Sequence, residues 1–178
     1  MGKNCTASGV YGIALGSWNT ASGGYGSVAL GDGASASLRA CLSLGGGYFG
    51  AIGDAQSMVL TLKNSTTDAT QTTLQAYGVN ATIPADTAWA FSALIVGRSN
   101  EADGNDTAAW TVTGLLKRDE SNNTAIVGTI TKTLLAADAG AAAWDVTIEA
   151  DNTNEALAVK VTGDAATNIR WVAKVDIA

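Results

Sequence analysis

The chain has 178 residues, a formal net charge of −6, a pI near 4.4 and no His. With 47% hydrophobic residues it can bury a core, so global disorder is excluded, while its 15% of charged residues falls well below the roughly 25% of typical soluble domains. The lack of His removes the commonest general base and transition-metal ligand, and the acidic balance opposes a partner bound through its phosphates. We therefore expect no enzyme, no catalytic residue, no metal, no cofactor and no nucleic-acid partner.

The first third of the chain is rich in glycine. Fourteen of the 21 glycines lie in residues 1–53, and beyond Asp54 the composition changes to runs of Thr, Val and Ala separated by charged loops. This change predicts two regions. Residues 1–55 are expected to form a glycine-rich attachment and trimerisation segment, and residues 56–178 a separate tip domain.

A short pattern repeats within the glycine-rich segment. Ala14-Leu15-Gly16 recurs as Ala29-Leu30-Gly31, and weaker copies follow at Ser43-Leu44-Gly45 and Ala51-Ile52-Gly53. A period of about 14 residues fits one rung of a coiled β-ribbon, in which Gly forms the corners, Ala allows close stacking and Leu or Ile points inward. Because two or three rungs bury little apolar surface alone, we expect several identical chains to associate, as a homotrimer.

The same segment resembles a known family. The pattern Ala-Leu-Gly, small residues, Ser-Gly, Tyr-Gly, Ala-Leu-Gly, Asp-Gly-Ala-Ser-Ala in residues 8–36 is similar to the head repeats of trimeric autotransporter adhesins, a left-handed β-roll also found in bacteriophage fibres. The resemblance is weaker over residues 37–55, where the spacing breaks. It implies a β-roll that attaches the chain to other virion proteins.

Residues 56–178 alternate apolar and polar side chains, the pattern of half-buried β-strands. The apolar faces include Met58, Leu60 and Leu62, then Trp89, Phe91, Ala93 and Ile95, and later Trp144, Val146 and Ile148. With weaker runs at 71–77 and 125–133, about eight strands separated by polar turns are expected. The predicted fold is all-β, an antiparallel β-sandwich of jelly-roll type. The stretch 136–143 is expected to be a loop or a single helical turn, and the apolar run 88–96 is too short to span a membrane.

Four tryptophans admit two interpretations. Exposed indole rings could stack on sugars, but each lies in register with aliphatic residues on one strand face, which favours core packing. They are Trp89, Trp110, Trp144 and Trp171. Tyr11 and Tyr25 occupy equivalent repeat positions, which favours a structural stack.

A second resemblance covers residues 83–178. It rests on Ile-Pro-Ala-Asp-Thr at 83–87, Val-Gly-Arg at 96–98, Val-Thr-Gly at 161–163 and Ile-Arg-Trp-Val-Ala at 169–173. These short motifs are similar to motifs in the closing β-domain of phage tail-fibre and related virion proteins. The resemblance implies a virion location and a host-facing tip.

Polar loops are the candidate contact sites, because carboxylates and amides match the hydroxyls of a glycan or the oxygen shell of a calcium ion. The alternative is that they are simply soluble turns. No loop has the spacing of an EF-hand, so no metal residue is assigned. The receptor-binding candidates are Asn100, Glu101, Asp103, Asn105, Asp106, Asn122, Asn123, Asp151, Asn152 and Asn154.

Together these features favour a homotrimeric phage fibre or fibre-tip subunit that binds a bacterial surface glycan or protein. Two alternatives stay open. A capsid decoration protein would use the same small, weakly charged surfaces for subunit packing. A polysaccharide depolymerase would need only two carboxylates at glycosidase spacing.

Overall fold

The computed structural model describes residues 2–178, without the side chain of Glu101. Within this range the regular structure consists of β-strands and two short 3₁₀ helices, so the all-β prediction is confirmed. The described residues contain no helix long and apolar enough to cross a membrane. The chain forms two compact units. The first holds the chain up to Thr61 with residues 76–79 and 176–178, and the second holds residues 62–75 and 80–175.

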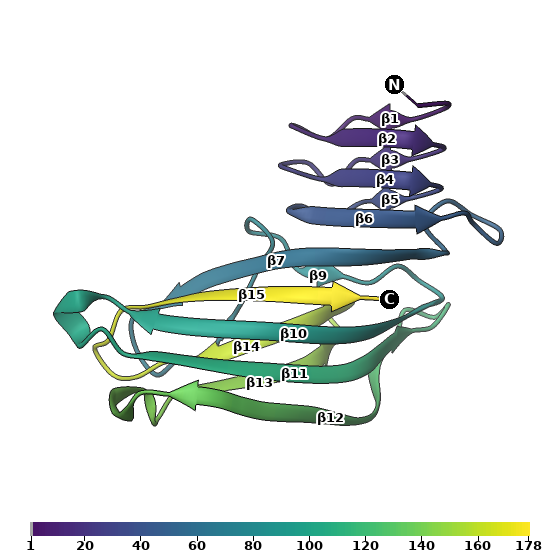
Figure 1. Cartoon of the computed structure of the whole chain (residues 1–178). Coiled ribbons are helices and arrows are strands. Elements are labelled where there is room, and N and C mark those ends of the chain that lie inside the picture. Colours follow the sequence, from purple (N-terminus) through teal and green to yellow (C-terminus); the bar gives the residue numbers. More distant parts are fainter. Residues whose placement is uncertain (1) are drawn as a thin grey trace. The chain divides into compact units, whose positions relative to one another are not determined.

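Short parallel strands stack in the first unit (Figure 1). One sheet contains β1 (Thr6–Ala7), β3 (Thr20–Ala21) and β5 (Ser35–Ala36), and the other contains β2 (Ile13–Ser17), β4 (Val28–Asp32) and β6 (Cys41–Gly46). Leu15 pairs with Leu30, and Leu30 pairs with Leu44, so the first three copies of the repeat stack in register. We call this arrangement the parallel coil.

The fourth copy of the repeat does not form a rung. Ala51-Ile52-Gly53 lies in a turn, and the strand that follows, β7 (Gln56–Thr66), runs antiparallel to β6. The turn is stabilised by Asp54, whose carboxylate accepts hydrogen bonds from the backbone N–H groups of Phe49, Gly50 and Ala51. An eight-residue spacing is too short to complete a circuit of the coil, which explains why the pattern stops there.

The interior of the parallel coil is built from small and polar residues. Ala29 and Ser43 are fully buried, whereas Leu15 and Leu44 are 50% and 47% exposed. The expectation that Leu and Ile point inward is therefore wrong for these strands. Adjacent strand residues face opposite sides, and the narrow space between the two sheets accommodates the alanine face rather than the leucine face.

Asn19 is the central polar residue of this interior. Its side chain is fully buried, donates to the carbonyl oxygens of Leu15 and Gly31 at 2.6 and 2.9 Å, and accepts from the backbone N–H of Ala34 at 2.7 Å. Gly31 has a positive φ of 99°, and a Cβ there would lie 2.3 Å from the carbonyl oxygen of Gly45. Stacked glycines thus permit the close approach of successive rungs.

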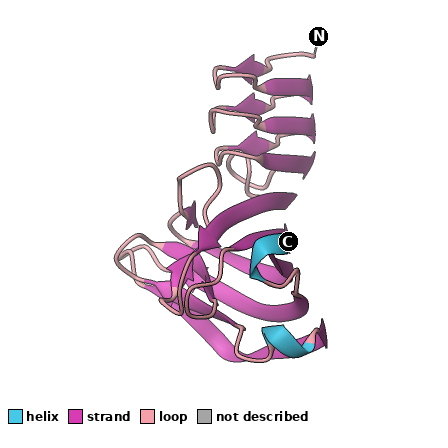
Figure 2. Ribbon diagram, turned by 90° about the vertical axis from the view of Figure 1, so that its left-hand side faces the viewer, coloured by secondary structure: helices cyan, strands magenta, loops and turns pink. Residues whose placement is uncertain are grey.

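The second unit is an antiparallel β-sandwich, with both 3₁₀ helices drawn in cyan in Figure 2. Its larger sheet has the order β12-β11-β10-β15-β7, and its smaller sheet contains β13 and β14 with the short strands β8 and β9. The bounds are β8 Thr72–Thr73, β9 Ala81–Thr82, β10 Thr87–Ser99, η1 Glu101–Asp103, β11 Thr107–Arg118, β12 Thr124–Ala137, η2 Ala139–Ala141, β13 Asp145–Asp151, β14 Ala156–Thr162 and β15 Ile169–Ile177.

Tryptophans fill the core of the sandwich, as the strand pattern predicted. Trp171 is at the centre, with ring centroids 5.9 Å from Trp110 and 5.5 Å from Trp144. Its indole N–H donates to the hydroxyl of Thr66 at 3.0 Å. A Cβ at Gly97 would lie 2.5 Å from the Trp171 ring, so glycine at that position makes room for the indole. Trp89 is buried as well.

Two weaker predictions need adjustment. In the run 71–77 only Thr72 and Thr73 form a strand, whereas Gln75 and Ala76 each make a single isolated bridge, to Lys63 and to Val79. The stretch 136–143 is divided between the end of β12 and the one-turn η2.

Candidate functional site

Two of the three predicted polar loops meet at one end of the sandwich. The β11–β12 turn carries Asn122 and Asn123, and the β13–β14 loop carries Asn152 and Asn154. The backbone N–H of Thr124 donates to the side-chain oxygen of Asn152 at 2.6 Å, which joins the two loops directly. We call this end, residues 118–124 and 151–155, the Arg118 loop cluster.

Arg118 connects the loops of this cluster. Its guanidinium donates to the carbonyl oxygen of Ile83 at 2.8 Å and to the side-chain oxygen of Asn122 at 2.6 Å. It also forms a 2.9 Å ion pair with Glu155. The Arg118 side chain is largely buried, which makes this pair less screened by solvent than an ordinary surface pair. The sequence offered no sign of this residue, because its three partners lie in three different segments.

Two aspartates shape the backbone of these loops. Asp119 accepts hydrogen bonds from the side chain and backbone of Asn123, which lower the pKa of its carboxyl. Asp151 accepts from the side chain and backbone of Asn154 and from the backbone of Thr153, with the same effect on its pKa. Both carboxylates therefore stay ionised at neutral pH and hold their turns closed.

The third predicted loop lies at the opposite end of the β10–β11 hairpin. Thr87 pairs with Arg118, whereas Arg98 pairs with Thr107, so about 36 Å of strand separates the two ends at roughly 3.3 Å per residue. The structure thus does not bring the Asn100–Asp106 loop into the Arg118 loop cluster.

The Asn100–Asp106 loop is ordered by its own side chains. Asn100 accepts from the backbone N–H of Asp103, and Asp103 accepts from the backbone and side chain of Asn168 at 2.9 and 3.0 Å. These bonds from Asn168 lower the pKa of Asp103. Asn105 accepts two hydrogen bonds from the Arg98 guanidinium, and the backbone N–H of Asp106 donates to Ser99. The side chain of Glu101 lies outside the described part of the chain.

The Arg118 loop cluster can offer both donors and acceptors to a hydroxylated ligand. Within residues 2–178, the amide N–H groups of Asn122 and Asn152 and the side-chain oxygens of Asn123 and Asn154 have no hydrogen-bond partner. A sugar hydroxyl both donates and accepts, so such a mixed set fits it. Receptor binding by these loops remains a prediction.

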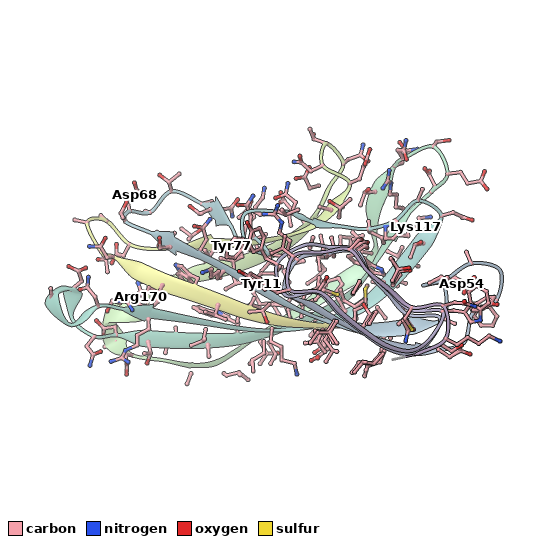
Figure 3. The ribbon with its side chains drawn as sticks, turned by 90° about the horizontal axis from the view of Figure 1, so that it is seen from above. Tyr11, Asp54, Asp68, Tyr77, Lys117 and Arg170 are labelled. Carbon is pink, nitrogen blue, oxygen red and sulfur yellow. The ribbon has the colours of Figure 1, made fainter. Side chains whose placement is uncertain are left out.

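An exposed group of aromatic side chains lies on the first unit. Tyr25 stacks on Tyr77 with a centroid separation of 4.7 Å and lies 6.4 Å from Tyr11. The Arg39 guanidinium sits 5.3 Å from the Tyr25 ring centre and donates to the carbonyl oxygen of Tyr77. Tyr11 and Tyr77 are labelled in Figure 3. The repeat predicted the contact of Tyr11 with Tyr25, but not Tyr77, which comes from outside the repeat.

Both cysteines are free thiols. Burial raises the pKa of Cys41, while a hydrogen bond with Ser43 partly opposes this shift. No group of three His, Cys, Asp or Glu side chains in the described residues is arranged to hold a metal ion.

Comparisons with known proteins identify phage tailspikes as structural neighbours. The chain is similar to tailspike gp49 of Acinetobacter baumannii bacteriophage Fri1, a capsular polysaccharide depolymerase, with 10% identity and a TM-score of 0.38. It is also similar to the tailspikes of A. baumannii phage AM24 and Acinetobacter phage vB_ApiP_P1, each 10% identical, with TM-scores of 0.39 and 0.29.

The matches cover 94, 93 and 94% of this chain but only 37, 33 and 38% of those tailspikes, in the same order. The chain therefore spans about a third of their length. No protein-family model and no curated protein matches it. The neighbours are phage tail proteins, the broad class that the sequence resemblance names. The resemblance to autotransporter heads remains a prediction.

One expectation is corrected by these neighbours. From the absence of His we expected that the chain is not an enzyme, but one neighbour is a capsular polysaccharide depolymerase. The expectation was wrong because it gave His too much weight. Two carboxylates suffice for acid–base cleavage of a glycosidic bond, and this chain has 16 acidic residues.

Proposed function

We propose that this chain is part of a homotrimeric bacteriophage tail protein that binds a bacterial surface polysaccharide. The observation that carries the proposal is the inverted pattern of the parallel coil, which buries alanine, serine and asparagine and exposes its large apolar side chains. Ile13 and Leu15 on β2 and Leu44 on β6 are all about half exposed, and Leu30 on β4, which pairs with both leucines, is partly exposed. Contiguous exposed apolar side chains of this kind mark an association surface.

Association through this face would bury the apolar side chains that are exposed to water in an isolated parallel coil. Completing the burial of a Leu or Ile side chain that is already half covered contributes about 1 kcal/mol. Because the leucines pair in register along the coil, one chain presents a continuous row to its copies. Three copies related by a closed three-fold axis would bring these rows together around a common centre.

Polysaccharide binding is assigned to the second unit. The Arg118 loop cluster offers amide groups without partners on a frame held rigid by Arg118, Asp119 and Asp151. A weak contact to one repeat unit of a polymer is strengthened when three copies of the site engage the same chain. The first unit would connect the protein to other virion components.

The two parts of the proposal have separate tests. Light scattering should give a mass close to three times 17.9 kDa for the unmodified chain. The double variant Leu15→Ser/Leu44→Ser should dissociate, whereas Leu94→Ser, which changes an equally exposed leucine of β10, should not. A monomeric unmodified chain would contradict the assembly.

Binding is tested by retention of the trimer on immobilised capsular polysaccharide purified from host strains. Retention by at least one polysaccharide supports the proposal, and retention by none contradicts it. Measuring new reducing ends in the same samples separates binding alone from depolymerisation, the activity of the Fri1 tailspike. Retention on empty capsids in place of polysaccharide would instead support a capsid decoration protein.

A further inference from the structure

An exposed row of aromatic side chains runs along one corner of the parallel coil. Tyr11, Tyr25 and Arg39 come from the corresponding turns of three successive rungs, between β1 and β2, between β3 and β4, and between β5 and β6. Tyr77 comes from residues 76–79, which belong to the same compact unit. Ring contacts at 4.7 and 6.4 Å join the three tyrosines into a continuous surface. We call these four residues the tyrosine corner.

Packing within the chain does not explain where these rings lie. Tyr11 is 80% exposed and Tyr77 54% exposed, and both have a positive backbone φ, of 60° and 49°. Bulky residues rarely adopt this conformation because the Cβ crowds the backbone. Tyr77 also occupies a position in the tight turn 76–79 where Asn or Gly is preferred. Its stack on Tyr25 offsets part of this strain, whereas the tilted and exposed ring of Tyr11 gains little. Strain of this kind is typical of ligand-binding positions.

The tyrosine corner also carries polar groups without partners. Within residues 2–178, the hydroxyls of the three tyrosines make no hydrogen bond. Arg39 donates once, to the carbonyl oxygen of Tyr77 at 3.1 Å, and its other N–H groups have no acceptor in the same part of the chain. A guanidinium binds a carboxylate through two parallel N–H bonds, so Arg39 can hold a carboxylate while it keeps its contact with Tyr77.

The charge around the tyrosine corner favours an anionic ligand, although the whole chain is acidic. Residues 2–53 carry only Lys3, Asp32 and Arg39 as charged side chains. The Arg39 guanidinium lies 5.3 Å from the ring centre of Tyr25, and it forms no ion pair with any acidic side chain that the structure describes. A cationic ligand would be repelled by Arg39, and a neutral one would leave its charge without a counter-charge.

We propose that the tyrosine corner binds an extended stretch of an acidic polysaccharide, with a sugar carboxylate on Arg39 and a neighbouring sugar ring on the free face of Tyr11. This inference rests on the proposed function and names the class of its polymer. A pyranose has an apolar face of C–H groups that suits an aromatic ring, and its hydroxyls can donate to or accept from the tyrosine hydroxyls. Because the row follows the stacking of the rungs, successive sugar residues of a linear chain can contact its members in turn.

A second copy of the chain is the competing occupant. The tyrosine corner lies in turns, whereas the exposed leucines of the proposed association surface lie on strands, Leu15 on β2 and Leu44 on β6. Burying Arg39 between copies would also require an acidic partner for its charge. A glycan lying on the surface leaves the guanidinium partly hydrated, so it is the favoured occupant.

The test follows the ring signals of the full chain, labelled with ¹³C in its four tyrosines, by ¹³C–¹H correlation NMR. Trigalacturonate and a hyaluronan tetrasaccharide are titrated separately, each against its methyl ester, which has the same rings without the charge. At least one acid should shift the Tyr11 signal saturably, leave Tyr48 unchanged, and bind at least tenfold more tightly than its ester. No saturable shift of Tyr11 with either acid, or equal affinities of acid and ester, would overturn the inference.

Tyr11→Asn removes the ring and introduces a residue that tolerates a positive φ. It should weaken binding of the acid about tenfold without lowering the free energy of unfolding, which a structural ring would not permit. Phe49→Asn, at a 90% exposed aromatic outside the tyrosine corner, is the matched control and should bind like the unmodified chain. Equal affinities of Tyr11→Asn and Phe49→Asn would contradict the assignment.

Arg39→Gln tests the part of the carboxylate. This variant should bind the acid and its methyl ester equally, whereas Arg170→Gln, at an exposed site on β15, should keep the preference for the acid. A preference that survives in Arg39→Gln would contradict the proposed ion pair. Light scattering of Tyr11→Asn addresses the competing occupant, because a lower mass than that of the unmodified chain would make the tyrosine corner a contact between copies and overturn the inference.

These results separate the inference from the proposed function. If capsular polysaccharide retains the trimer but neither acid binds at Tyr11, the function stands and the tyrosine corner is wrongly assigned. If an acid binds at Tyr11 but no capsular polysaccharide is retained, the assignment stands and the proposed function fails.

Discussion

The backbone N–H of Ala34 donates a 2.7 Å hydrogen bond to the side chain of Asn19, 15 residues earlier in the chain. The same side chain donates to the carbonyl oxygens of Leu15 and Gly31. One asparagine thereby satisfies backbone groups from two successive rungs of the parallel coil. A buried amide can do this because it carries both a donor and an acceptor.

Asn19→Ala should lower the free energy of unfolding by about 3 kcal/mol, because it leaves three backbone groups in a dry interior without their partner. Urea denaturation at one fixed protein concentration measures the change. The exposed Ser22 of the same unit offers a control, and Ser22→Ala should leave stability nearly unchanged. Equal stabilities of the two variants would show that Asn19 is not structurally important.

Gly31→Ala and Gly26→Ala separate backbone strain from crowding. Both glycines have a positive φ, but a Cβ at Gly31 would lie 2.3 Å from the Gly45 carbonyl oxygen, whereas one at Gly26 would meet nothing within 4 Å. Gly26→Ala should cost about 1–2 kcal/mol from conformation alone. Gly31→Ala should cost clearly more in thermal or urea unfolding. A reversed order would contradict the close packing of the rungs.

Thr66→Val should destabilise the sandwich by about 1–3 kcal/mol. The substitution preserves the shape of the side chain but leaves the buried indole N–H of Trp171 without its 3.0 Å acceptor. Thr61→Val, at an exposed position of the same strand, is the matched control. The measurement is urea unfolding followed by tryptophan fluorescence. Unchanged stability in Thr66→Val would mean that this hydrogen bond contributes nothing net.

Arg118→Lys should loosen the Arg118 loop cluster, although the charge is retained. A lysine ammonium is a compact group that cannot reproduce the planar fork by which Arg118 contacts Ile83, Asn122 and Glu155 together. We expect a loss of about 2 kcal/mol in unfolding free energy and faster proteolytic cleavage within 119–123. Arg170→Lys, an exposed site on β15, should change neither quantity. Equal cleavage rates in Arg118→Lys and Arg170→Lys would contradict the role of Arg118 in linking these loops.

Asp103→Asn should reduce stability at pH 6 and have little effect at pH 2. Hydrogen bonds from Asn168 lower the pKa of Asp103 in the folded chain, so its contribution is fully present above the unfolded pKa of about 4 and is lost as the pH falls through the folded value. Urea unfolding at several pH values measures the difference between the variant and the unmodified chain. Asp86→Asn, which changes an aspartate that does not contact Asp103 or Asn168, provides a control. If the two unfolding free energies differed by the same amount at every pH, the stabilisation could not come from the ionised Asp103 carboxylate.

Much of the second unit was predictable from local patterns. Alternation with a period of two identifies which residues of a strand share a face, and the clustering of Trp89 and Phe91 with aliphatic residues identified that face as buried. The repeat likewise predicted that Leu15, Leu30 and Leu44 occupy equivalent positions on successive rungs. Equivalence along a repeat is a local property, so the spacing alone was sufficient.

Local sequence patterns were therefore sufficient to predict the all-β class, the rung register and the core faces of the sandwich. The three-dimensional fold was needed to establish that Leu15 and Leu44 of the parallel coil face outward. Alternation separates the two faces of a strand but does not indicate which face lies between the sheets. The fold also decided that Arg118 joins two loops and that Tyr77 stacks on Tyr25. Contacts between segments tens of residues apart depend on how the strands are ordered in space, and no local pattern carries that information.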